Sequence, residues 1–75
     1  MKYTDGIEIK VGDRVLMPDG IVGTVVVSLD NNQYSTNYLK SDWEYLSNGI
    51  MIESKKEGLI HYGEDYNLRV QHCND

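Results

Sequence analysis

A β-rich stretch, RVLMPDGIVGTVVVSL at residues 14–29, decides the fold class of this chain. Two apolar runs, residues 14–17 and 21–29, are separated by Pro18-Asp19-Gly20. Proline presets φ for a turn and glycine supplies a positive φ, so the tripeptide predicts a turn between two strands. Gly23 interrupts the second run, which is typical of a bulge or of a sharp bend where a strand curls.

Three further strands are predicted in the second half of the chain, at about residues 50–54, 59–62 and 67–71. Residues 55–58 should form a hairpin turn, and residues 63–66 suit a single 3₁₀ turn. Five short strands cannot bury a two-sided core as a flat sheet, so we expect a mainly β, five-stranded small barrel. Strand alternation predicts a common core of Val15, Val25, Val27, Ile52, Ile60, Leu68 and Val70.

A long polar segment separates the second and third predicted strands. Residues 30–41 have loop composition, and a loop of this length in so small a domain is usually functional or partly disordered.

Residues 41–49 allow two interpretations. A hairpin turn at Asn48-Gly49 would place Glu44 opposite Glu53, a like-charge pair that destabilises a sheet. A capping box of Ser41 and Glu44, with Gly49 as the stop, instead predicts a short helix near residues 42–48. We favour the helix, because it places Trp43, Leu46 and Ile50 on one face.

The predicted layout resembles the SH3-like barrel, with a long loop after the second strand and a tight turn at residues 55–58. Residues 11–15 (VGDRV), followed by Gly20 and by residues 23–25 (GTV), resemble the entry of KOW-type modules. The whole chain is also similar to a group of short, functionally undefined bacterial proteins, on residues 12–15, Tyr34-Ser35, Trp43 with Tyr45-Leu46, and residues 58–62. This resemblance implies a fold and an immunity-like or accessory role. It carries no catalytic residues.

Length and charge narrow the function further. The 75 residues predict a single domain, residues 1–75, in which residues 72–75 form a frayed tail. The net charge of −5 argues against a dedicated nucleic-acid binder, whose footprint is basic. We expect neither a signal peptide nor a membrane span, and a single cysteine fits a reducing cytoplasm.

The histidines, the cysteine and the serines lack the partner residues that a metal site or a catalytic site needs. Zinc sites need four ligands in paired spacings, so His72-Cys73 is expected to be an exposed tail, and His61 a structural histidine. No serine lies in a nucleophile elbow, and no phosphate-binding glycine loop is present. The sequence predicts a protein that is not an enzyme and has no metal and no cofactor.

The aromatic residues point to a binding surface. Phe is absent, and four of the seven Tyr and Trp residues lie between residues 34 and 45, among more acids than bases. Tyrosine and tryptophan are enriched at interface hot spots. We therefore predict a non-enzymatic, protein-binding module that docks a basic protein or peptide through segment 30–45. The predicted contact residues are Asp30, Tyr34, Tyr38, Asp42, Trp43 and Glu44, with Tyr62 and Tyr66 as the second choice.

The acidic charge of this surface also bears on the alternative partners. An acidic aromatic surface can stack on bases but repels phosphate, so a KOW-type nucleic-acid or ribonucleoprotein accessory is the second interpretation. We expect no membrane partner, and a chain that is monomeric or weakly homodimeric.

Overall fold

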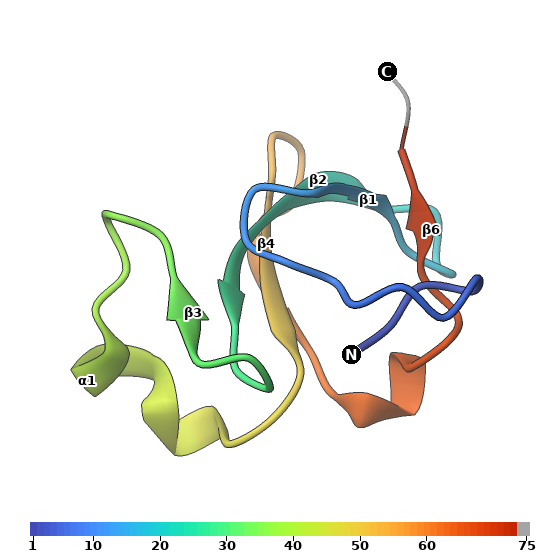
Figure 1. Ribbon diagram of the computed structural model, residues 1–75. Coiled ribbons are helices and arrows are strands. Elements are labelled where there is room, and N and C mark those ends of the chain that lie inside the picture. The colour runs from blue at the N-terminus through green and yellow to red at the C-terminus, as the bar shows by residue number, and fades with distance from the viewer. Residues whose placement is uncertain (74–75) are drawn as a thin grey trace.

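Six antiparallel strands form one sheet in the computed structural model, which describes residues 1–73 (Figure 1). The strands follow the order β5-β4-β2-β1-β6, and β3 pairs with β2 beside this path. Their bounds are β1 (Arg14–Leu16), β2 (Val22–Ser28), β3 (Gln33–Tyr34), β4 (Ile50–Ser54), β5 (Gly58–Tyr62) and β6 (Gln71–His72). The helical elements are α1 (Lys40–Trp43) and two 3₁₀ turns, η1 (Glu44–Leu46) and η2 (Glu64–Tyr66). The mainly β class, the hairpin of β4 and β5 and the 3₁₀ turn before the last strand are therefore confirmed.

Strand β2 is the centre of the sheet and changes partner along its length. Residues 22–24 pair with β1, residues 27–28 pair with β3, and residues 24–28 pair with β4. Gly23 lies at a close approach of β2 to β4, because a Cβ there would come within 2.8 Å of the Glu53 carbonyl oxygen. The register shift that marks a bulge lies between Val25 and Val27, so the irregularity is centred beyond Gly23.

The expected five-stranded closed barrel is wrong in two respects. The described residues contain a sixth strand, β3, within the segment predicted to be a loop, and β5 and β6 do not pair within residues 1–73. The last predicted strand, residues 67–71, is shortened by Leu68, whose φ of +63° breaks the extended backbone. Strand β6 therefore begins only at Gln71. The N-terminal segment lies against it instead, since Tyr3 bridges Val70 and the Thr4 N–H donates to the Val70 carbonyl.

Two apolar clusters take the place of a single core. The first contains Val15, Val25, Ile52 and Val70, as predicted, together with Met1, Tyr3, Ile9, Met17, Ile50 and Tyr62. Val27 belongs instead to a second cluster with Val26, Leu29 and Met51, because the bulge turns two successive valines away from the first cluster. Ile60 is half-buried against the first cluster, and Leu68 is 51% exposed, so the core prediction is wrong for Leu68.

The middle segment contains the favoured helix, although its start differs. Residues 40–46 are helical, and Asn48-Gly49 is not a hairpin tip. The capping box is wrong, because Leu39 is the N-cap, makes no side-chain cap bond, and leaves Ser41 within the helix. Trp43 and Leu46 pack against the second cluster together, whereas the predicted third member of that face, Ile50, is part of β4.

The C-terminal segment is better ordered than expected. His72 pairs with Val15, and its ring stacks on Tyr3 with centroids 3.6 Å apart. The Cys73 N–H donates to the Arg14 carbonyl. The frayed-tail prediction is wrong for these two residues, and its remainder, residues 74–75, lies outside the described residues. In the described part of the chain, no helix has the length and apolar character needed to cross a bilayer.

Candidate functional site

Residues 30–48 form a lobe against one side of β2 and β4, beside the main body of the sheet (Figure 1). Four half-buried residues of this lobe, Tyr34, Tyr38, Trp43 and Leu46, pack against the second apolar cluster. Tyr34 also belongs to β3, where it pairs with Val27 of β2. Segment 30–45 is therefore attached to the sheet by the aromatic rings that were predicted to contact a partner. Tyr34 and Trp43 have packing roles that compete with partner contact.

The solvent side of the lobe carries different residues. Leu39 is 62% exposed and Tyr45 is 71% exposed, the largest values among the exposed large apolar side chains of the described chain. Two predicted site residues, Asp42 and Glu44, are exposed between them. Because Trp43 and Leu46 face the sheet, Tyr45, one of the two residues between them, points away from it. We name Leu39, Asp42, Glu44 and Tyr45 the acidic helical surface.

Tyr38 joins the lobe to the sheet through a polar contact. Its hydroxyl donates to Glu53 Oε2 at 2.9 Å, and its ring lies 6.3 Å from that of Trp43. The hydrogen bond to the Glu53 carboxylate, with some desolvation, raises the pKa of Tyr38 above its ordinary value. This contact fixes a third carboxylate beside the lobe.

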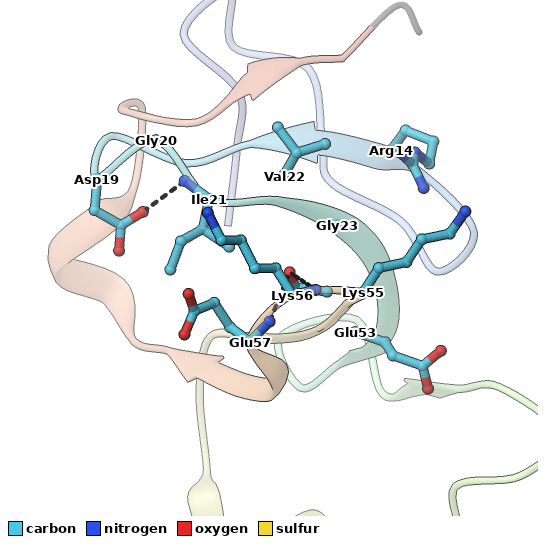
Figure 2. Close-up of a pocket in the computed structure, with 11 residues that line it drawn as sticks. Arg14, Asp19, Gly20, Ile21, Val22, Gly23, Glu53, Lys55, Lys56 and Glu57 are labelled. Atoms are coloured by element: carbon cyan, nitrogen blue, oxygen red, sulfur yellow. Dashed lines mark hydrogen bonds between the residues drawn. The ribbon is translucent and has the colours of Figure 1, made fainter.

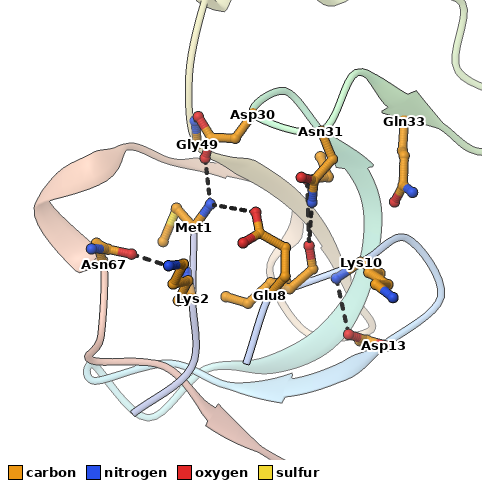
Figure 3. A network of polar contacts seen from close by, with 12 residues as sticks. Met1, Lys2, Glu8, Lys10, Asp13, Asp30, Asn31, Gln33, Gly49 and Asn67 are labelled. Carbon is orange, nitrogen blue, oxygen red and sulfur yellow. Dashed lines mark hydrogen bonds and ion pairs between the residues drawn. The ribbon is translucent and has the colours of Figure 1, made fainter. Parts of the chain in front are cut away.

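Asp30 is a structural anchor. Figure 3 shows its contact with the Met1 amine, in which Oδ2 accepts a hydrogen bond at 2.5 Å, and Oδ1 accepts from the Gly49 N–H at 3.3 Å. The side chain of Asp30 is only 22% exposed, and Glu8 lies 3.8 Å from the same amine. Its carboxylate thus ties the N-terminus to both ends of the lobe. This structural role competes with the predicted partner contact of Asp30.

Tyr62 and Tyr66 lie apart from the lobe. Tyr62 is buried in the first cluster, its hydroxyl donates to Asp19 Oδ2 at 2.9 Å, and burial followed by this bond raises its pKa. Tyr66 is half-buried, meets Tyr62 edge to face at 4.8 Å, and lies under the Arg69 guanidinium. The burial of Tyr62 leaves only Tyr66 accessible at this second-choice surface.

A groove of about 480 Å³ separates the β1–β2 turn from the β4–β5 turn (Figure 2). Three cations, Arg14, Lys55 and Lys56, line it together with three anions, Asp19, Glu53 and Glu57. Arg14 also donates to the Thr24 hydroxyl at 3.3 Å. The lining has no net charge to attract a phosphate, which gives no support to the KOW-type interpretation.

Leu39 and Tyr45 were missed by the contact prediction, which favoured aromatic residues in the loop. Helical periodicity around Trp43 and Leu46 was the signal that could have placed Tyr45 on the outside.

Within residues 1–73, no three His, Cys, Asp or Glu side chains come together as possible metal ligands. Comparison of the chain with protein-family models, curated proteins and solved structures found no match.

Proposed function

We propose that this protein is a non-enzymatic binding module whose acidic helical surface docks a basic protein or peptide. The observation that carries the proposal is the exposure of Asp42, Glu44 and Tyr45 on the helical segment 40–46, together with the exposure of Leu39 at its N-cap. A tyrosine anchor next to a leucine, with charge at the rim, is the composition of a small interface.

Charge selects a basic partner. The acidic helical surface and the neighbouring Glu53 carry three carboxylates, and Lys40 is the cation within the same helical segment. The net charge of −5 adds a long-range attraction that accelerates encounter with a cationic partner. An accessory or immunity-like role, in which this surface covers a basic protein, is a specific form of the proposal.

The fold supports a scaffold role for the sheet. The strand order β5-β4-β2-β1-β6 and the 3₁₀ turn before β6 support an SH3-like architecture, with the lobe inserted after β2. Small sheets of this kind hold variable loops on a rigid base, and binding residues are concentrated on such loops.

Two peptides of equal length test the proposal. A twelve-residue peptide of alternating lysine and leucine is titrated into ¹⁵N-labelled protein, followed by its counterpart with glutamate in place of lysine. We expect saturable shifts of the Leu39, Asp42 and Tyr45 amides with the basic peptide only. Equal response to both peptides, or shifts centred elsewhere, would overturn the assignment of the surface.

A twelve-nucleotide single-stranded RNA serves as the third probe. The acidic surface should not bind it at 0.15 M salt, a physiological ionic strength. RNA binding that weakens steeply as salt is raised would replace the proposal with the KOW-type function.

A further inference from the structure

The edge of β5 is the open end of the sheet. Strand β5 pairs with β4 alone within residues 1–73, and its five residues, Gly58-Leu59-Ile60-His61-Tyr62, contain no Lys, Arg, Asp or Glu. Charged side chains and proline are the usual means by which edge strands avoid pairing with another chain. Leu59 is exposed and Ile60 half-exposed, so the edge is apolar as well as unpaired.

The other end of the sheet is covered. The N-terminal segment bridges Val70 just before β6, and the Thr4 N–H donates to the Val70 carbonyl. The ring of Tyr3 also stacks on His72 of β6. The two ends therefore differ, and only β5 offers a long unprotected edge.

We propose that β5 pairs with β5 of a second copy of this chain, antiparallel across a two-fold axis at Ile60. This register uses all five residues of the strand. It places Leu59 opposite His61 of the second copy, and Gly58, which has no side chain, opposite the large Tyr62.

The residues on either side of β5 make the edge complementary to itself. The turn before the strand carries Lys55 and Lys56, and η2 after it begins with Glu64 and Asp65. In an antiparallel pair each basic turn approaches the acidic turn of the other copy. All four side chains are exposed. This charge pattern favours a second copy over an unrelated extended peptide, which would have to supply both signs at this spacing.

The dimer should be weak, because a single five-residue strand buries little surface and each copy has a net charge of −5. A dissociation constant on the order of 0.1–1 mM is expected at 0.15 M salt. The association uses residues outside the acidic helical surface. It is therefore independent of the proposed function.

A charge-swap experiment tests the proposal by sedimentation equilibrium from about 20 μM to 2 mM. The wild-type chain should dimerise, and K55E/K56E should weaken this at least tenfold. The variant E64K/D65K should also be monomeric, whereas an equimolar mixture of the two variants should form a heterodimer, because mixing restores both sets of opposite charges.

The matched control is K10E/K40E, which changes two exposed lysines outside β5 and has the same net charge of −9 as K55E/K56E. It should still dimerise. A monomeric wild-type chain at 2 mM would overturn the proposal. It would also fail if the control lost association as K55E/K56E does, or if the two swapped variants did not associate when mixed.

Discussion

Gly49 is the position at which one added methyl group should do most damage. Its φ is +93°, and a Cβ there would overlap the carbonyl oxygen of Tyr62. The residue cannot easily move, because its N–H donates to Asp30 and its carbonyl accepts from the Leu29 N–H. It connects the lobe to β4 and passes directly beside the end of β5.

The magnitude follows from comparison with Gly58. Gly58 has a similar φ of +81°, but a Cβ there meets no atom within 4 Å. Gly58→Ala should therefore cost about 1–2 kcal/mol, the strain of a left-handed backbone. Gly49→Ala adds a backbone overlap of about 1–3 kcal/mol, for a total of about 2–5 kcal/mol. That loss is a large part of the stability of a 75-residue domain.

Urea denaturation followed by far-UV circular dichroism measures both variants. Trp43 fluorescence provides a second probe, because this tryptophan packs the lobe against the sheet. We expect Gly49→Ala to unfold at much lower urea than Gly58→Ala, or to be unfolded in buffer. Equal midpoints for the two variants would refute the close approach of Gly49 to Tyr62.

Three further predictions concern stability. Burial and carboxylate contacts raise the pKa of Tyr3 and Tyr62 in the folded chain. Both hydroxyls therefore stay protonated near pH 10, where the same tyrosines ionise in the unfolded chain, so the free energy of unfolding should fall above that pH. Tyr62→Phe should make this decline shallower by about 1.4 kcal/mol per pH unit, and an unchanged slope in alkaline urea titrations would contradict the burial argument. Asp30→Asn should cost about 1.5–3 kcal/mol through its bonds to the Met1 amine and Gly49, and a loss below about 0.5 would show that the network is unimportant. Ile52→Ala should cost about 2–5 kcal/mol by urea denaturation, because the side chain is fully buried, and a near-neutral result would contradict the first cluster.

Much of the sheet could be predicted because its signals are local. The turn at residues 18–20, the hairpin between β4 and β5 and the 3₁₀ turn at Glu64–Tyr66 each follow from a few neighbouring residues. The course of the last strand could not be predicted in this way. Leu68 alternates correctly with Val70, but a positive φ at a leucine depends on tertiary contacts, such as the bond from its N–H to the Lys2 carbonyl.

The division into two clusters was also beyond a sequence argument. Three successive valines at residues 25–27 do not indicate which face of the strand is buried. Only the bulge places Val25 in the first cluster and Val27 in the second. The same limit applies to the candidate site. Composition indicated segment 30–45, but the half-burial of Trp43 and the exposure of Tyr45 depend on which side of the helical segment packs against Met51 and its neighbours.

The most direct test of the binding surface compares two single substitutions, each of which replaces a large exposed side chain with alanine. Tyr45→Ala removes a highly exposed ring from the acidic helical surface, and Ile7→Ala removes a side chain that is 56% exposed on the N-terminal segment. Both should leave the free energy of unfolding within about 0.5 kcal/mol of the wild-type value. By isothermal titration with the basic peptide, Tyr45→Ala should weaken binding about 30-fold, as expected for the loss of about 2 kcal/mol at a hot spot, and Ile7→Ala should leave it unchanged. Equal affinities for the two variants would contradict the assignment of partner binding to this surface.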